Sequence, residues 1–204
     1  MWITPTTLVG SIATLVPLEV KHAADLLAAA EPELFRFTPQ APPEWSVAGF
    51  ERDIARVTSL HDVVALAIVH NASGRAIGRT TYMDIRADAR GVEIGRTWIA
   101  RAHQGTRVNP EIKYLMLRHA FEALSPGAIR VQLTTGGTNL HSQRAISKLG
   151  AVREGVLRKF RIVPSGADPD SPRMVRDTVI FSILDDEWPH VKRELEARMA
   201  GVQR

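Results

Sequence analysis

The segment from Arg101 to Asn109, Arg-Ala-His-Gln-Gly-Thr-Arg-Val-Asn, could bind an anion. It joins a predicted strand to a helix predicted from Pro110, and the first amide groups of a helix have no partner within that helix. Such amides lie at the positive end of the helix dipole and bind phosphate. Gly105 allows close backbone approach, and Arg101 and Arg107 add positive charge. Many strand-to-helix turns contain one glycine, so a solvated turn is the alternative to a phosphate site.

The helix after this loop has clear signals for its start. Asn109 is predicted as the N-cap, Pro110 suits the first helical position, and Glu111 complements the positive end. Apolar residues form two stripes along this helix. We therefore expect most of its circumference to be covered beneath a sheet.

Alternating apolar residues predict seven strands, and apolar residues at helical spacing predict five helices. The strands are expected at Ala13–Leu18, Asp62–His70, Ala76–Ile85, Val92–Ile99, Ala128–Thr135, Val152–Ile162 and Thr178–Leu184, and the helices at Lys21–Ala30, Ser46–Ser59, Pro110–Leu124, Leu140–Leu149 and Asp185–Ala200. Turn-forming residues predict a hairpin turn at Asn71–Gly74 and a long hairpin loop at Pro164–Asp177. The order of elements predicts a mixed α/β fold with a largely antiparallel sheet.

The composition excludes several classes of protein. The chain has 204 residues, of which 45% are hydrophobic and 24% charged, typical of one globular domain. It contains no cysteine, so disulfides, thiolate metal sites and cysteine nucleophiles are excluded. The seven histidines show no paired metal-ligand spacing, and serine-hydrolase, P-loop and dinucleotide motifs are absent, so we expect no metal. A net charge of +4, dispersed along the chain, does not predict nucleic-acid binding.

The N-terminal segment is apolar but has neither a basic leader nor a run long enough to span a membrane. We therefore expect a cytoplasmic protein that does not bind membranes.

Several segments form an ordered set of motifs along the chain. They are Glu33-Leu-Phe-Arg-Phe37, Val92-Glu-Ile-Gly-Arg-Thr-Trp-Ile99, the loop described above, Glu111 to Glu122, Asn139 to Ala151, Glu154-Gly-Val-Leu-Arg158 and Arg176-Asp-Thr-Val179. Together they resemble the GNAT superfamily and, more narrowly, the RimJ/RimL-type N-acetyltransferases that modify protein N-termini. The resemblance implies a single GNAT domain over residues 1–204. Within it, 1–60 would hold the first strand and the acceptor-side helices, 62–151 the cofactor-binding core, and 152–204 a C-terminal hairpin and helix. The implied sheet has about seven strands, is splayed between strands four and five, and carries helices on both faces.

The resemblance also implies acetyl-CoA as cosubstrate. By position, the loop that would cradle its pyrophosphate comprises Gln104, Gly105, Thr106, Arg107, Val108 and Asn109. Trp98 and Ile99 would border the pantetheine arm, and a backbone amide between Trp98 and Ala100 would polarise the thioester oxygen. The family pattern has Arg or Gln first and Gly or Ala last, whereas Ala102 and Arg107 stand there. Arg107 would either bond the phosphate or obstruct it, and we favour the bond.

Acetyl transfer to an amine requires the neutral amine, because its lone pair attacks the carbonyl carbon. Glu93 is the candidate base, acting through a water, and the alternative is a surface or hairpin-paired carboxylate. Asn139 and Ser142 match the family's Asn-x-x-Ser, so Asn139 would contact pantetheine or simply cap the next helix. That helix has no tyrosine to protonate the departing thiolate, and Ser142 is the predicted substitute, with Ser147 or a water as alternatives.

The predicted function is therefore transfer of acetyl from acetyl-CoA to a primary amine by direct attack in a ternary complex. The resemblance favours a protein N-terminal α-amine, of the ribosomal-protein type, as acceptor. A polyamine, amino acid or antibiotic acceptor is the nearest alternative, and a non-catalytic acyl-CoA-binding protein is another. A homodimer is compatible with these expectations.

Overall fold

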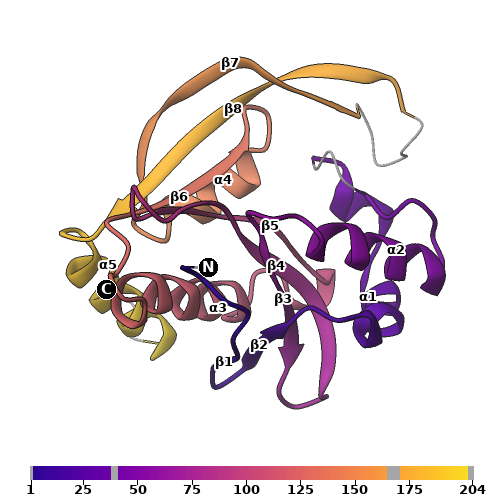
Figure 1. The fold of residues 1–204 in the computed structure, drawn as a ribbon, viewed down its shortest axis with the longest axis horizontal. Helices are drawn as coiled ribbons and strands as arrows, with labels where there is room; N and C mark the ends of the chain where they lie inside the picture. The colour runs from indigo at the N-terminus through magenta and orange to yellow at the C-terminus, as the bar shows by residue number, and fades with distance from the viewer. Residues whose placement is uncertain (1, 38–40, 165–170, 202–204) are drawn as a thin grey trace.

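One eight-stranded sheet organises the computed structural model, which describes residues 2–37, 41–164 and 171–201. The strand order is β1-β2-β3-β4-β5-β6-β8-β7, and every neighbouring pair is antiparallel except β5 and β6 (Figure 1). The strands are β1 Leu8–Val9, β2 Ala13–Pro17, β3 Val64–His70, β4 Arg75–Arg86, β5 Gly91–Ile99, β6 Arg130–Gly136, β7 Val152–Pro164 and β8 Arg173–Leu184. The helices are α1 Ala23–Ala29, α2 Val47–Thr58, α3 Val108–Arg118, α4 Leu140–Ser147 and α5 Trp188–Met199, with short turns η1 Val20–His22, η2 Pro32–Phe35, η3 Arg101–His103 and the π-helical η4 His119–Ala123.

The mixed α/β fold predicted from sequence is confirmed, and two strand predictions need correction. β1 was not predicted, because two residues are too short to show alternation. β8 begins at Arg173 rather than Thr178, so the end of the predicted loop Pro164–Asp177 belongs to a strand. Residues 173–176 pair with Pro164 to Arg161 across a long two-stranded arm. Residues 165–170 of that predicted loop lie outside the described residues.

The start of α3 also differs from the prediction. The helix begins at Val108 with Arg107 as its N-cap, so Asn109 is not the cap and Pro110 is the third helical residue. A proline is tolerated there, because the amides of the first turn have no partner in the helix anyway.

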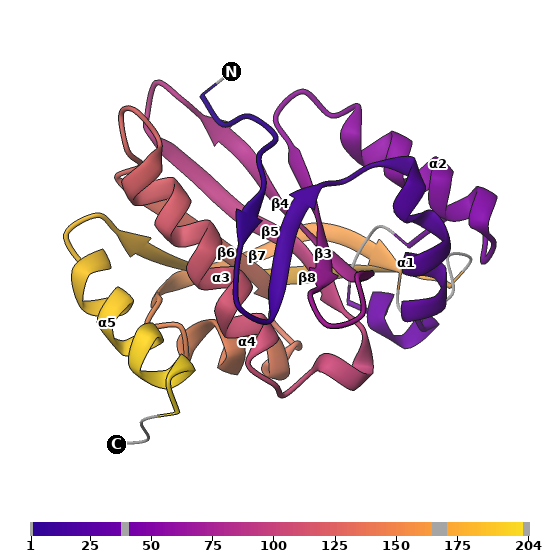
Figure 2. The same cartoon turned by 90° about the horizontal axis from the view of Figure 1, so that it is seen from below.

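Hydrophobic residues bury on both faces of the sheet, and alternation along β3 shows how. Leu66 and Ile68 belong to a large core with α3, α4 and α5, whereas Ala65 and Ala67 belong to a second core with α1 and α2. Figure 2 shows α1 and α2 at one end of the molecule, with α3 crossing the sheet beside α5. Helices therefore cover both faces, as the sequence predicted.

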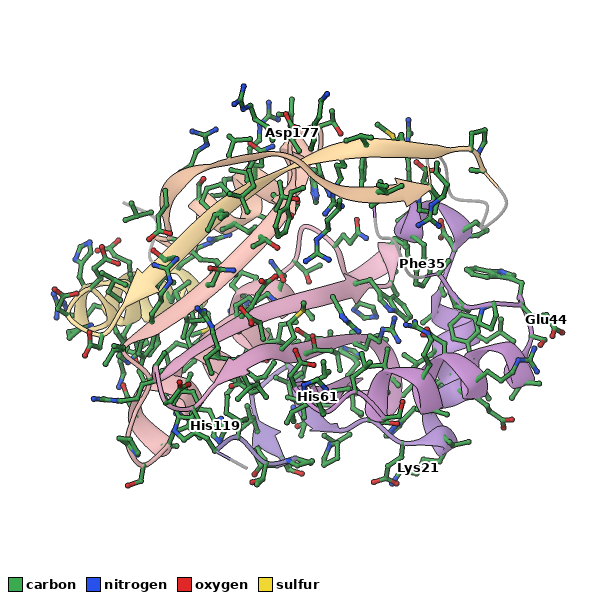
Figure 3. The ribbon with its side chains drawn as sticks, turned by 45° about the horizontal axis from the view of Figure 1, so that its top comes forward. Lys21, Phe35, Glu44, His61, His119 and Asp177 are labelled. Carbon is green, nitrogen blue, oxygen red and sulfur yellow. The ribbon has the colours of Figure 1, made fainter. Side chains whose placement is uncertain are left out.

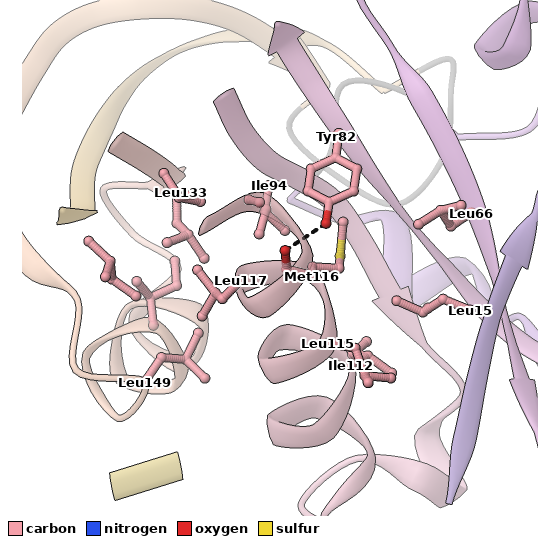
Figure 4. Packing of buried hydrophobic residues seen from close by; sticks show 14 of the residues in the cluster. Leu15, Leu66, Tyr82, Ile94, Ile112, Leu115, Met116, Leu117, Leu133 and Leu149 are labelled. Carbon is pink, nitrogen blue, oxygen red and sulfur yellow. Dashed lines mark hydrogen bonds between the residues drawn. The ribbon is translucent and has the colours of Figure 1, made fainter. Parts of the chain in front are cut away.

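Buried polar contacts fix α3 against the sheet. Tyr82 of β4 donates a hydrogen bond to the Met116 carbonyl oxygen at 2.6 Å, within the apolar packing (Figure 4). Near the other end of α3, the buried Glu111 carboxylate accepts bonds from the backbone amides of Ser11, Ile12 and Ala13 and from the Ser11 hydroxyl, at 2.5–2.9 Å. These bonds attach the connection between β1 and β2 to the helix, a role that sequence did not reveal.

No helix among the described residues is long and apolar enough to cross a membrane.

Candidate active site

The central feature of the candidate site is the separation of β5 from β6. These parallel strands pair only from Gly91 to Glu93, opposite Arg130 to Gln132. Beyond Glu93, β5 continues to Ile99 along β4, while β6 continues to Gly136 along β8. The backbone edges that face one another across this opening are therefore available to a ligand that pairs with strands.

Glu93 lies where the two strands separate. Its side chain is 5% exposed, so it is not the surface carboxylate that was the alternative from sequence. One oxygen accepts a bond from Gln132 Nε2 at 3.0 Å and the other from Thr134 Oγ1 at 2.7 Å. Both donors come from β6, so they hold the carboxylate at the mouth of the opening.

A β-bulge in β5 decides which side chains face the same way. Thr81 pairs with Gly95 and Arg79 with Trp98, so two residues of β5 lie opposite Thr80 alone. Arg96, within the bulge, has a φ of 49°. A bulge adds one residue and reverses the alternation beyond it.

The burial pattern shows this reversal. Ile94 and Ile99 are five residues apart, which regular alternation would place on opposite faces, yet both belong to the core beneath α3. Trp98 belongs instead to the core with α1 and α2. The two residues predicted to border the pantetheine arm, Trp98 and Ile99, therefore bury on opposite faces.

Trp98 connects the site with the N-terminal helical region. Its ring centroid is 5.4 Å from that of Phe35 in η2, and both residues are buried. Phe35 is thus a packing residue, whereas Phe37 is 40% exposed. In the view of Figure 3, Phe35 lies below the arm formed by β7 and β8. Within the described ranges the buried Trp98 Nε1 has no hydrogen-bond partner.

The loop after β5 is shaped by its own side chains. Gln104 Nε2 donates to the Ile99 carbonyl oxygen at 2.9 Å, and the Thr106 hydroxyl donates to the His103 carbonyl oxygen at 2.7 Å while accepting from the Val108 amide at 3.2 Å. Gly105 has a φ of 72°, and a Cβ there would meet open space. No acceptor in the described part of the chain bonds the amides of residues 105–107. This arrangement fits an anion such as a pyrophosphate.

Arg107 does not fold over this loop. Its Nη1 donates to the Met199 carbonyl oxygen at the end of α5, at 2.8 Å. Arg101 pairs with Glu31 at 2.9 Å. Asn109 is half-buried in the first turn of α3.

Of the backbone amides between Trp98 and Ala100 that were predicted to polarise the thioester oxygen, the Ala100 amide is already bonded. It donates to the Ile77 carbonyl oxygen, which leaves it unavailable to a thioester oxygen.

α4 begins close to the end of β6. Asn139 is its N-cap, and its Oδ1 accepts a bond from the Ser142 amide at 3.1 Å, which is one of the two roles predicted for it. Its contact with pantetheine stays a prediction. Gln143 donates from Nε2 to the carbonyl oxygens of Gly136 and Gly137, at 3.1 and 2.9 Å. Ser142 is half-buried, and its hydroxyl has no hydrogen-bond partner among the described residues.

A buried lysine lies under the bulge. Lys113 of α3 is 6% exposed, and its Nζ donates to Thr97 Oγ1 at 2.7 Å. Thr97 also contacts Thr80 Oγ1 at 2.7 Å. Burial lowers the pKa of Lys113 to about 7, because the charged form loses its hydration.

Sequence reasoning missed Gln132, Thr134, Gln143 and Lys113. The first two were detectable in principle, because they alternate with the buried Val131 and Leu133 and so share one face of β6. The other two are separated from their partners in sequence, and no local pattern indicates the contacts.

No group of three or more His, Asp or Glu within the described residues could hold a metal ion.

Comparison with known proteins places this geometry in a family. Residues 13–152 match the family model described as an acetyltransferase (GNAT) domain. No curated protein matches the chain. A T. thermophilus protein provisionally named an acetyltransferase is 37% identical, with a TM-score of 0.86 over 97% of this chain and 99% of that chain. A GCN5-related N-acetyltransferase from Brucella melitensis is 27% identical, with a TM-score of 0.87 over 98% and 87%.

Mycobacterium smegmatis RimJ in complex with CoA-disulfide has the same fold, at 20% identity, with a TM-score of 0.76 over 95% of each chain. The GNAT model matches more than half of the chain, and acetyl-CoA is the acetyl donor of that family. This chain therefore belongs to the GNAT acetyltransferases.

Proposed function

We propose that this protein transfers an acetyl group from acetyl-CoA to the N-terminal α-amine of a protein, of the ribosomal-protein type, by direct attack in a ternary complex. The observation that carries the proposal is the Glu93 carboxylate, held from β6 where β5 and β6 separate. An exposed or hairpin-paired carboxylate would not have supported it.

Glu93 is suited to accept the amine proton. Each oxygen already accepts one bond, yet a carboxylate has about four lone-pair positions, so both retain capacity. Because its two donors come from β6, Glu93 keeps its orientation as the acceptor enters. A base in a fixed position contributes typically 10²–10⁴-fold to such a reaction.

In this proposal, different residues bind the cosubstrate and protonate its leaving group. Acetyl-CoA supplies the acetyl group as a thioester. The free amides of residues 105–107 and the start of α3 would hold the pyrophosphate, and Trp98 and Ile99 would border the pantetheine arm. Ser142 would donate its hydroxyl proton to the departing sulfur as the carbon–sulfur bond breaks and the carbon–nitrogen bond forms.

Two arguments support an N-terminal amine as acceptor. An α-amine has a pKa of about 8 and is about one-tenth neutral at pH 7, whereas a lysine side chain at about 10.4 is almost wholly protonated. One carboxylate base is thus better matched to the α-amine. The fold neighbours also include a ribosomal-protein-S5-alanine acetyltransferase from Vibrio fischeri, at 16% identity with a TM-score of 0.70 over 90% of this chain and 98% of that chain. A cytoplasmic location belongs to the same proposal.

Release of the CoA thiol from acetyl-CoA, measured with peptides of varied first residue, tests this function. Wild type should release thiol in the presence of peptide, and Glu93→Gln should lower kcat about 10²-fold with little change in acetyl-CoA affinity. Asp88→Asn removes the same charge from the exposed β4–β5 turn and serves as the matched control. Equal kcat for Glu93→Gln and wild type would refute the base assignment. Thiol release with polyamines or antibiotics but not with peptides would refute the acceptor class.

A further inference from the structure

Arg96 in the β5 bulge lies within electrostatic range of Glu93 and of Arg161 in β7, and Arg161 lies within range of Arg176 in β8. These three arginines come from three strands. Each carries a positive charge, and no carboxylate among the described residues forms an ion pair with any of them. Arg161 repels both Arg96 and Arg176, so this grouping needs an explanation. The guanidinium of Arg161 itself lies over the exposed Phe160 ring, 5.3 Å from its centroid.

Arg161 and Arg176 are placed by the arm. They are Cα partners in the antiparallel ladder of β7 and β8, so their side chains leave the same face of the arm. Arg176 is half-buried, and its Nη1 donates to the Phe37 carbonyl oxygen at 2.7 Å. Its Cδ would lie 3.0 Å from a Cβ built on Gly136. The guanidinium of Arg176 therefore spans from the end of β6 to the segment after η2.

Arg96 approaches Arg161 from β5, in the central part of the sheet. It is half-buried, and Nη1 of Arg96 and Nε of Arg176 are buried without a hydrogen-bond partner in the described part of the chain. Burial lowers the pKa of both guanidinium groups, and Arg161 lowers each further by repulsion. Arg56, Asp62 and Glu93 also act electrostatically on Arg96.

Several other arginines that approach the interior bond a carboxylate. The buried Arg79 bonds Asp53, which also binds Arg56, and Arg130 bonds Glu154. A buried or half-buried guanidinium is costly without an acceptor, because its donors lose water. Among the described residues Arg96, Arg161 and Arg176 have no such carboxylate partner, and Arg96 lies near Glu93, the base of the proposed function.

We infer that the amine acceptor carries a carboxylate close to its reactive amine, and that Arg96, Arg161 and Arg176 receive it. This inference rests on the proposed function, because it treats the space beside Glu93 as the acceptor site. The phosphates of CoA are not the ligand inferred for these arginines, because they would bind at the loop of residues 101–109. The charged groups that act on Arg96 and Arg176 lie instead on α2, β5, β7 and the α2–β3 connection. A carboxylate would satisfy the free donors by charge-assisted bonds.

The test compares two amidated tripeptides, Ser-Glu-Glu and Ser-Gln-Gln, which share the reactive amine and differ only in charge. Wild type should use the acidic peptide at least tenfold better in kcat/KM at low salt, with a smaller difference at physiological salt. Arg161→Glu should abolish or reverse this preference. Arg158→Glu makes the same change at an exposed position of the same strand and should retain it.

A binding measurement separates this inference from the proposed function. Calorimetric titration of both peptides into the protein with CoA present needs no turnover. Tighter binding of the acidic peptide by wild type, lost in Arg161→Glu, would support the inference even without acetyl transfer to peptides. Equal binding together with equal acetylation of both peptides would overturn the inference and leave the proposed function intact. Free glutamate, assayed in parallel, identifies a small-molecule source of the carboxylate if it surpasses the acidic peptide.

Discussion

Lys113 gives the sharpest quantitative prediction, because it is a buried lysine whose hydrogen-bond partner is the neutral Thr97 hydroxyl. Its pKa is about 7 in the folded protein, compared with 10.5 for an ordinary lysine. Between these values the unfolded chain binds a proton that the folded protein has released. The free energy of unfolding must therefore rise with pH across this window.

The size of the effect follows from the shift. Each pKa unit corresponds to 1.36 kcal/mol, so a shift of about 3.5 units amounts to an upper limit of about 5 kcal/mol below pH 7. Between pH 7 and pH 9 the contribution of Lys113 should improve by about 2 kcal/mol. Lys113→Met keeps the length of the side chain and removes the charge. The variant should be more stable than wild type at pH 7 and should lack this part of the pH dependence.

Urea unfolding at pH 7, 8 and 9 measures both quantities. Lys148→Met, at an exposed position of the C-cap of α4, is the matched control and should follow wild type at every pH. If wild type and Lys113→Met gained stability in parallel from pH 7 to pH 9, Lys113 would be protonated in the folded protein, and the burial argument would be wrong.

Two further predictions concern the cofactor loop and the N-terminal turn. Gly105→Glu places a carboxylate among the free amides of the loop, so calorimetric titration should show acetyl-CoA affinity falling more than 100-fold. The control Gly74→Glu imposes similar backbone strain, at a φ of 66° in a distant turn, and should leave the affinity for acetyl-CoA unchanged. Glu111→Gln should lower the free energy of unfolding by roughly 3 kcal/mol, because buried amides lose a charged acceptor, whereas Glu33→Gln should cost under about 1 kcal/mol. Burial tends to raise the pKa of Glu111, but its hydrogen bonds lower it overall, so wild type should also lose stability as pH falls below 4.5. An unchanged urea midpoint in Glu111→Gln would contradict this reading.

Local signals in the sequence were sufficient for most elements of the fold. Alternation located β3 to β6, and Ser46 was correctly expected at the start of α2, where its hydroxyl accepts the Gly49 amide. These signals work because each depends on residues within a few positions of one another. They failed at the start of α3, where the cap is Arg107 and its side chain makes no capping bond.

The candidate site was predicted in part, from the order of motifs. Glu93 and the loop at Gly105 were named from resemblance, and the structure adds the reasons that such positions can act: donors on β6 for the carboxylate, and free amides in the loop. Their roles in catalysis and binding stay predictions until the measurements above are made.

By itself, the sequence determined the fold class, the approximate elements and the position of the loop predicted to bind an anion, because these depend on local periodicity and chain order. Only the tertiary structure decided how β5 and β6 diverge, how the bulge at Arg96 turns Glu93 and Trp98 to one side, and how Lys113 loses its water. It also decided that Arg161 approaches Arg96, from a strand more than 60 residues further along the chain. Such contacts depend on strand register and on packing between distant segments, for which no short stretch of sequence carries a signal.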